Sequence, residues 1–243
     1  MHTEPVSWER LVPEAMDNAV SFQHQLLKQH LERYMFAGQF VSGKKVLDAA
    51  CGSGYGTEIL KKAGALSVTG LDVDQPTLVR ASKLYGGAGI EFRQQDLNSF
   101  SGTDWEFDVL VSFETIEHLD RPQQYLCEIN SALKRDGYFI GSVPVAPLVD
   151  IDQYHKHDFT KNSWQKLVKD CNFEVLAELP QRYCATLREL LEEHKAPNTL
   201  PGARDNQLRY YIKHPLSAIT RITRLLRYGL EFDTLTLVCR KQQ

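Results

Sequence analysis

The chain has 243 residues, of which 42% are hydrophobic and 24% are charged, and its formal net charge is −3. A chain of this length and composition can bury a full core, so it needs no disulfide or metal staples. The balanced charge argues against a nucleic-acid-binding protein, and no apolar run is long enough to cross a bilayer.

The cysteines and the amino-terminal segment indicate the compartment. There are five cysteines, an odd number, and none belongs to a C-x-x-C pair. This usage is typical of reduced thiols in a cytoplasm and argues against a disulfide framework or a zinc knuckle. Residues 1–10 are polar and lack the apolar core of a signal peptide. We therefore expect a cytoplasmic protein.

Residues 18–41 carry apolar side chains at helical spacing, which predicts an amphipathic helix that packs beside the turn following it. The apolar face of this helix contains Phe22, Leu26, Leu27, Leu31 and Tyr34. We assign residues 1–43 to an N-terminal helical lid.

The next stretch has the order of strand, tight turn and helix. Val46 and Leu47 lead into Asp48, and a helical stretch begins at Tyr55. Between them, small residues alternate at Ala50, Gly52 and Gly54. Their missing side chains let the backbone approach a ligand at the carboxyl end of the strand. The spacing is not the G-x-G-x-x-G that a pyrophosphate needs, so it indicates a nucleotide-type ligand without phosphates and argues against a dehydrogenase.

Two further predicted strands also end in acids. Asp72 lies near the end of the strand at 67–73, at about the 20-residue distance where a carboxylate can take both ribose hydroxyls. Asp96 and Leu97 stand at the end of the strand at 90–96. The alternative is that each acid only caps the turn after its strand.

The element Asp48-x-Ala50-x-Gly52-x-Gly54 resembles motif I of the class I S-adenosylmethionine-dependent methyltransferases, with Ala50 where that family most often has glycine. The resemblance covers roughly residues 30–183 and implies S-adenosylmethionine as the cofactor. It also implies that Asp96 accepts the adenine amino group. The cofactor-binding residues that we predict are Tyr34, Asp48, Ala50, Gly52, Gly54, Asp72, Val73, Asp96, Leu97 and Phe113.

Short apolar strands alternate with helical stretches between residues 44 and 145, a pattern that predicts a parallel sheet with helices on both faces. The resemblance implies an α/β, Rossmann-like fold whose seven-stranded, mostly parallel sheet has an antiparallel last strand. The predicted strands are 44–50, 67–73, 90–96, 107–114, 137–145, 172–177 and 234–240. We assign 44–183 to the cofactor-binding core, 184–232 to a helical insertion for the acceptor or a partner, and 233–243 to the last strand of the core.

A candidate catalytic element, E-x-x-E-H, follows the fourth strand. In one helical turn, Glu114, Glu117 and His118 would share a face and could hold a divalent cation such as Mg²⁺ or Mn²⁺. The element resembles those of the ubiquinone-pathway O-methyltransferases and of the small-RNA 3′-terminal 2′-O-methyltransferases. It also occurs in glycan methyltransferases, where no metal is implied. The alternatives are a cofactor or strand-end hydrogen bond for Glu114, a solvated Glu117, and His118 as general base or packing residue.

A second histidine cluster lies in the loop after the fifth strand. By the resemblance to methyltransferases encoded with glycan-assembly enzymes, His155 faces the acceptor, and in the RNA enzymes a similar histidine is a metal ligand. His157 has no such match and is interpreted as a surface or supporting residue. Thr160 is predicted to cap the helix that follows. Tyr183, at the end of the sixth strand, is a candidate wall of the acceptor pocket.

The predicted insertion contains a basic amphipathic helix at 215–228, with arginines every three residues. It is compatible with an anionic membrane surface, a polyanionic acceptor or a partner subunit, and also with a solvated charged face.

A hydroxyl acceptor needs a base, or a cation that lowers its pKa. We therefore predict O-methylation of a sugar or glycan hydroxyl, as in polysaccharide biosynthesis. His118 or His155 acts as base with Glu117 nearby, or Glu114, Glu117, His118 and His155 bind a metal. The alternatives are a quinone or catechol acceptor, an RNA 2′-hydroxyl, and a catalytically silent S-adenosylmethionine-binding module.

Overall fold

The computed structural model describes residues 21–145, 154–185 and 230–242, together with residues 13, 212 and 215. The elements in chain order are α1 (Ser21–Gly38), β1 (Lys45–Ala49), α2 (Tyr55–Lys62), β2 (Ser67–Asp72), α3 (Gln75–Tyr85), β3 (Ile90–Gln94), η2 (Leu97–Ser99), β4 (Phe107–Phe113), η3 (Ile116–His118), α4 (Pro122–Ala132), β5 (Leu133–Pro144), α5 (Lys161–Asp170), β6 (Phe173–Ala185) and β7 (Leu230–Lys241).

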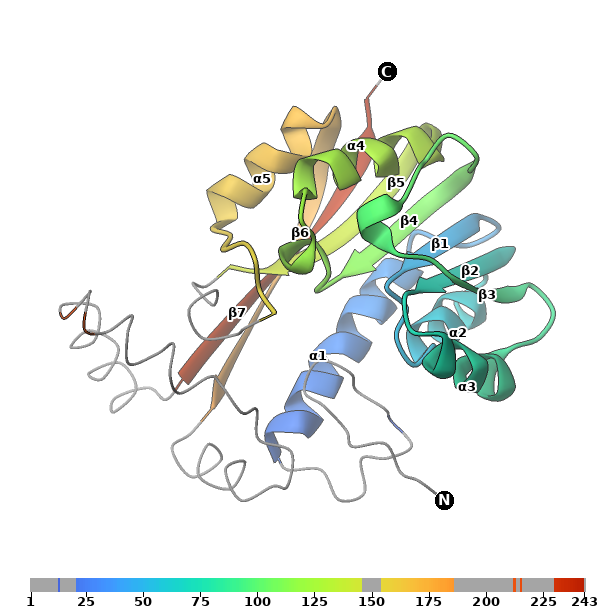
Figure 1. The fold of residues 1–243 in the computed structure, drawn as a ribbon, viewed down its shortest axis with the longest axis horizontal. Coiled ribbons are helices and arrows are strands. Elements are labelled where there is room, and N and C mark those ends of the chain that lie inside the picture. Colours follow the sequence, from blue (N-terminus) through green and yellow to red (C-terminus); the bar gives the residue numbers. More distant parts are fainter. Residues whose placement is uncertain are drawn as a thin grey trace.

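The seven strands form one sheet in the order β3-β2-β1-β4-β5-β7-β6, with helices packed around it (Figure 1). The pairs among β1 to β5 are parallel, whereas β7 pairs antiparallel with both β5 and β6. The strand order reverses between β1 and β4, and ligands of such sheets bind outside the carboxyl ends of the strands at that point. The predicted seven-stranded, mostly parallel sheet is therefore confirmed.

Alternate side chains of the strands build two separate cores, one on each face of the sheet. Leu47 and Leu110 face a core that also contains residues of α4 and α5. Val46 and Val109 face the other core, which contains residues of α1 and α2. Residues of α1 are buried in this second core, so α1 is a packed part of the domain. Each fully buried aliphatic side chain stabilises the fold by about 1.5–3 kcal/mol.

Three strands are longer than the sequence predicts. β5 begins at Leu133, four residues before the expected start at 137, and β6 continues to Ala185 instead of ending at 177. β7 begins at Leu230, and its antiparallel pairing with β6 runs as far as Ala185 opposite Leu230. Antiparallel pairing satisfies backbone groups over the full ribbon, which a short apolar pattern does not reveal. Residues 186–211 and 216–229, which hold most of the predicted insertion and of its basic helix, lie outside the described residues.

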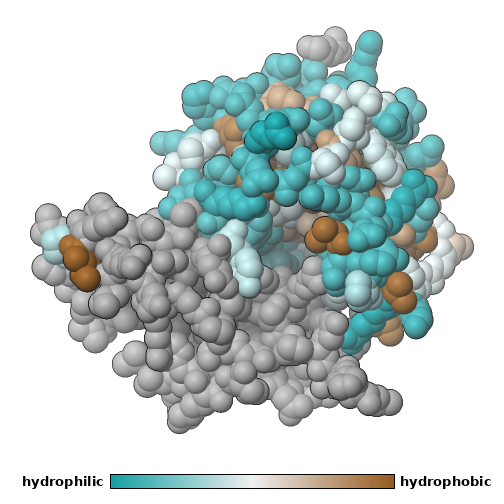
Figure 2. All heavy atoms as spheres, in the orientation of Figure 1, coloured by the Kyte–Doolittle hydropathy of each residue, from teal (hydrophilic) through white to brown (hydrophobic). Residues whose placement is uncertain are grey.

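The surface of the described residues is mainly hydrophilic in the view of Figure 2, with apolar residues scattered among polar ones. None of the described helices is long and apolar enough to span a membrane. The four cysteines whose side chains are described are free thiols. This agrees with the predicted absence of a disulfide framework in that part of the chain.

Candidate functional site

The alternation of small residues after β1 is explained by backbone conformation. Ala50, Gly52 and Gly54 have φ of 62°, 53° and 88°, which is the left-handed region that glycine adopts without strain. Ala50 adopts it with a side chain, at a cost of about 1–2 kcal/mol. The loop therefore turns sharply at every second residue between β1 and α2.

Gly52 of this loop and Gly56 in the first turn of α2 have different surroundings. A Cβ atom at Gly56 would lie 2.0 Å from the Tyr34 ring, so this glycine lets α1 pack closely against α2. A Cβ atom at Gly52 would have no neighbour within 4 Å. Gly52 therefore borders open space, as a loop that cradles a ligand requires.

Asp48, at the end region of β1, is buried and hydrogen-bonded from both sides. The Tyr34 hydroxyl lies 3.1 Å from Oδ1, and the Thr57 hydroxyl lies 2.7 Å from Oδ2. Burial raises the pKa of Asp48 to about 6, although both hydrogen bonds oppose that shift. The nearby charge of Asp72 adds to the increase. The site thus contains a carboxyl group whose ionisation is costly.

Tyr34, one of the predicted cofactor-binding residues, is itself buried, with 5% of its surface exposed. Its ring makes edge contacts with Tyr55 at 5.8 Å and with Phe113 at 5.0 Å between centroids. Burial, followed by the charge of Asp48, raises the pKa of Tyr34 well above its usual value. Tyr34 therefore ties α1 to the ends of β1 and β4.

The acids after β2 and β3 accept backbone hydrogen bonds. Asp72 accepts from the N–H of Gly52 at 3.0 Å and from the N–H of Asp74 at 2.9 Å. Asp96 accepts from the N–H of Asn98 at 2.9 Å. These contacts match the alternative in which the acids cap turns, and the bond from Gly52 also holds the Asp72 carboxylate beside the loop after β1. The assignment of Asp72 and Asp96 to ribose and adenine stays a prediction.

Two apolar residues lie close to these acids in the chain. Val73 is 57% exposed, whereas Leu97 is buried. The amide of Gln94 donates to the Val73 carbonyl at 2.9 Å and so links the ends of β2 and β3. Val73 therefore gives this edge of the sheet an exposed apolar side chain.

Glu114 does not share a helix face with Glu117 and His118, so that expectation was wrong. Its φ of 48° turns the chain sharply after β4, and η3 begins only at Ile116. The Glu114 carboxylate accepts from the hydroxyl of Ser142 at 2.8 Å. A left-handed residue at the strand end redirects the chain, which the helical spacing rule did not take into account.

Glu117, His118 and His155 meet at the carboxyl end of the sheet. Their ligand atoms lie within 4.8 Å of one another, and no other such group of three occurs among the described residues. Nε2 of His118 lies 3.9 Å from a Glu117 oxygen, and the centroids of the two imidazole rings are 4.7 Å apart. The Glu117 side chain is 1% exposed and that of His118 is 31% exposed. His118 is therefore the open member of a mostly buried cluster.

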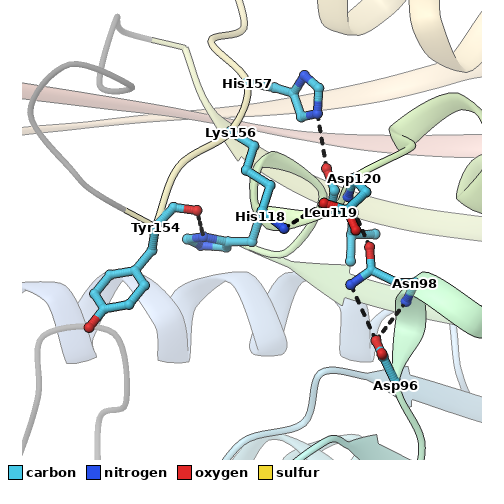
Figure 3. Close-up of polar contacts among 8 residues, drawn as sticks. All are labelled: Asp96, Asn98, His118, Leu119, Asp120, Tyr154, Lys156 and His157. Atoms are coloured by element: carbon cyan, nitrogen blue, oxygen red, sulfur yellow. Dashed lines mark hydrogen bonds and ion pairs between the residues drawn. The ribbon is translucent and has the colours of Figure 1, made fainter.

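The two histidines of this cluster have different surroundings. Nδ1 of His118 lies 3.1 Å from the Tyr154 carbonyl oxygen (Figure 3). A carbonyl oxygen only accepts, so we assign the proton to Nδ1 and the lone pair to Nε2. Burial, and then the charge of His118, lower the pKa of His155 to about 4. His155 is therefore neutral at physiological pH.

Other predicted residues near the site have structural contacts. Thr160 caps α5, with its hydroxyl accepting from the N–H of Ser163, as predicted. The His157 ring points to the Leu119 carbonyl at 2.9 Å. Tyr183 is buried near the end of β6. Its role as a pocket wall stays a prediction.

Sequence reasoning missed four residues that build the site. They are Thr57 and Gly56 on α2, Ser142 on β5 and Asn98 on η2. Gly56 and Thr57 lie two and three positions after Gly54, the last residue of the motif, so its extension by three positions would have found them. Ser142 is adjacent to Phe113 only through the register of two parallel strands, and the sequence holds no signal for that register.

The comparisons with known proteins agree with this fold. Residues 47–141 match the family model described as a methyltransferase domain. The chain is 28% identical over 196 residues to a protein of Mycolicibacterium smegmatis named a probable S-adenosylmethionine-dependent methyltransferase, covering 78% of this chain and 73% of the relative. The domain, the fold and the relatives together identify a methyltransferase domain of the S-adenosylmethionine-dependent class.

Two further similarities are informative. The chain is 32% identical over 126 residues to the ubiquinone biosynthesis O-methyltransferase of Pasteurella multocida, covering 47% of this chain and 52% of that relative, so it spans about half that enzyme's length. The crystal structure of a methyltransferase candidate from Bacillus halodurans has a TM-score of 0.70 at 17% identity. The match covers 88% of this chain and 100% of that one, and at this identity it shows the fold alone.

Proposed function

We propose that this chain is an O-methyltransferase that transfers a methyl group from S-adenosylmethionine to a hydroxyl of a small acceptor. The observation that carries the proposal is the orientation of His118. Its Nδ1–H is held by the Tyr154 carbonyl, so the lone pair of Nε2 is directed away from that bond and belongs to the cluster with Glu117 and His155. A histidine held in this way suits a general base.

The residues after β1, β2 and β3 fit the proposed donor. The space next to Gly52, the carboxylates of Asp72 and Asp96, and the exposed face of Val73 lie along the carboxyl ends of the strands. Bound S-adenosylmethionine would supply a methyl group activated on a sulfonium, which becomes a thioether when the carbon–sulfur bond breaks. The chain has only to align the acceptor and exclude water.

The acceptor hydroxyl loses a proton in this reaction, and a base must accept it. As the acceptor oxygen forms its bond to the methyl carbon, its proton passes to Nε2 of His118. His155 is neutral because its pKa is about 4, so its ring adds no positive charge that would oppose protonation of His118. Glu117 lies 3.9 Å from Nε2 and would stabilise the imidazolium that forms.

The same cluster also fits a divalent cation, which gives a second form of the mechanism. Two imidazoles and one carboxylate within 4.8 Å form a set that suits Mn²⁺, Fe²⁺ or Zn²⁺ better than Mg²⁺, which prefers oxygen ligands. Glu114 is bonded to Ser142 and lies outside this group. A bound cation would lower the pKa of the acceptor hydroxyl, and Glu117, His118 and His155 would hold it.

The acceptor class that we propose first is a sugar or glycan hydroxyl, on the sequence resemblance at the E-x-x-E-H element and at His155. A quinone or catechol hydroxyl is the second candidate, because a relative at 32% identity is named a ubiquinone biosynthesis O-methyltransferase. An RNA acceptor is disfavoured by the net charge of −3. Contact of residues 215–228 with a membrane surface is a further proposal, and it does not affect the choice of acceptor.

Methyl transfer from labelled S-adenosylmethionine tests the proposal. The acceptor panel consists of nucleotide-sugars, oligosaccharides, catechols and short RNA, each assayed with EDTA, Mg²⁺ or Mn²⁺. Transfer to sugars supports the first candidate, and transfer to catechols alone favours the second. Loss of transfer in EDTA with recovery in Mn²⁺ selects the metal form over the histidine base. Binding of S-adenosylhomocysteine without transfer to any acceptor would instead indicate a catalytically silent module.

A further inference from the structure

Residues 116–120 include Glu117 and His118, and this turn is hydrogen-bonded to neighbouring segments on two sides (Figure 3). The loop at 154–157 lies on one side and provides His155. The residues that follow β3 lie on the other side and include Asp96. We call residues 116–120 the catalytic turn.

The loop at 154–157 holds the catalytic turn mainly through the backbone. The N–H groups of Lys156 and His157 both donate to the Glu117 carbonyl, at 2.8 and 3.2 Å. The His118 ring returns a bond to the Tyr154 carbonyl at 3.1 Å. These contacts place the loop against the turn, but backbone bonds alone do not explain why this loop sequence holds it.

Two side chains of this loop also contact the catalytic turn. Nε2 of His157 lies 2.9 Å from the Leu119 carbonyl oxygen and donates to it, since that oxygen only accepts. Nζ of Lys156 lies 2.7 Å from Asp120, but the two side chains are 47% and 64% exposed. Exposed ion pairs contribute little. The hydrogen bond from the partly buried His157 ring is therefore the side-chain contact that fixes the turn on this side.

On the cofactor side, Asn98 holds the same turn. Its Oδ1 accepts from the Asp120 N–H at 2.9 Å, while its own N–H and Nδ2 donate to Oδ1 of Asp96 at 2.9 and 3.3 Å. Asn98 thus connects the predicted adenine acid to the turn that carries His118. An asparagine can do this because its amide both accepts and donates.

We propose that His157 and Asn98 are positioning residues, which clamp the catalytic turn from the acceptor side and from the cofactor side. His157 keeps His118 aligned with the Tyr154 carbonyl and with His155. Asn98 links this alignment to Asp96, the predicted adenine acid that follows β3. Neither residue touches the reacting atoms. The catalytic importance of this turn rests on the proposed function. The effect of His157 and Asn98 on His118 can, however, be measured without an acceptor.

The test compares His157→Gln, whose amide nitrogen can replace Nε2, with His157→Met, which has no donor. Long-range proton–nitrogen NMR spectra of the full chain report which His118 nitrogen carries the proton. We expect a single Nδ1–H form in the wild type and in His157→Gln, and a mixture of both tautomers in His157→Met. The affinity for S-adenosylhomocysteine should stay within about twofold in both variants. Wild-type His118 signals in His157→Met would overturn the role of His157.

Three further variants complete the design. His157→Asn is too short to reach Leu119 and replaces the methionine variant if that one does not fold. Lys156→Met removes only the exposed ion pair and should leave the His118 signals unchanged. Asn98→Ala should weaken S-adenosylhomocysteine binding by about twofold to tenfold, the value of one lost hydrogen bond, and should also shift the His118 signals. Unchanged His118 signals in Asn98→Ala would overturn the link to the cofactor side. An enzyme that methylates none of the acceptors would contradict the proposed function while leaving these signals readable.

Discussion

The Tyr34 hydroxyl lies 3.1 Å from Asp48, so a helix that precedes the sheet reaches a carboxylate at the end region of its first strand. The ring of Tyr34 lies over Gly56 and against Phe113. Through these contacts of Tyr34, α1 is part of the candidate site. The close packing of Tyr34 on Gly56 and the burial of Asp48 both lead to measurable consequences.

Gly56→Ala is expected to destabilise the domain by about 1–3 kcal/mol, because the added Cβ atom would lie 2.0 Å from the Tyr34 ring. Urea unfolding of the full chain measures this change. Gly52→Ala is the matched control, because its Cβ atom would meet no atom within 4 Å. Its φ of 53° still strains an alanine, so its unfolding free energy should fall by only about 1 kcal/mol. A larger loss in the control than in Gly56→Ala would contradict this account of the packing.

Ala50→Gly is expected to stabilise the domain by up to about 1 kcal/mol. Ala50 has a φ of 62°, and glycine adopts that conformation without a clash of Cβ. The greater entropy of glycine in the unfolded chain offsets part of the gain. Asn172→Gly is a comparison outside the site, since Asn172 also has a positive φ, of 59°. Asparagine tolerates this region better than alanine does, so the gain there should be smaller. A loss of stability in Ala50→Gly would mean that the Ala50 side chain contributes packing that outweighs the strain.

The sequence predicts the fold and the loop after β1 well, because both depend on local patterns. Alternating small residues match alternate left-handed backbone positions, and strands ending in acids match the carboxyl edge of the sheet. The hydrogen bond from Tyr34 to Asp48 was not predictable, because Tyr34 lies on a separate helix. Contacts of this kind depend on how elements pack, not on residue spacing.

The candidate catalytic cluster was predicted in part. Glu117, His118 and His155 come together although 37 residues separate the last two, because the loops after β4 and β5 meet at neighbouring strand ends. Helical spacing groups Glu114 with them, but its φ of 48° places it outside the helix. The sequence predicts a supporting or surface position for His157, and only the structure shows its hydrogen bond to Leu119. Spacing rules fail where one left-handed residue changes the direction of the chain.

His118→Asn is expected to lower kcat by about 10²- to 10⁴-fold, the usual contribution of a general base. The amide of asparagine can still donate toward the Tyr154 carbonyl, so the turn should keep its place while the lone pair of Nε2 is lost. Methyl-transfer rates at saturating acceptor, together with S-adenosylhomocysteine affinity, measure the effect. The affinity should not change. Lys156→Met should keep nearly full activity, and a wild-type kcat in His118→Asn would exclude His118 as the base.

Asp48→Asn is expected to make the domain more stable at neutral pH. Burial raises the pKa of Asp48 from 3.8, its ordinary value, to about 6 in the folded chain. At a pH between these two values, the folded state therefore binds a proton at Asp48 that the unfolded state has released. The favourable contribution of Asp48 is therefore fully present below about pH 4 and is lost as the pH rises through about 6. The shift of about two pKa units corresponds to a loss on the order of 3 kcal/mol.

The pH dependence of the difference between the two proteins isolates this effect, because all other groups are shared. Urea unfolding at several values between about pH 4 and pH 8 should show Asp48→Asn gaining on the wild type up to about pH 7, then keeping a constant advantage. The asparagine oxygen can still accept from Thr57. A difference that does not change with pH would mean that Asp48 is ionised in the folded chain at its usual pKa, and that Tyr34 and Thr57 offset the whole cost of its burial.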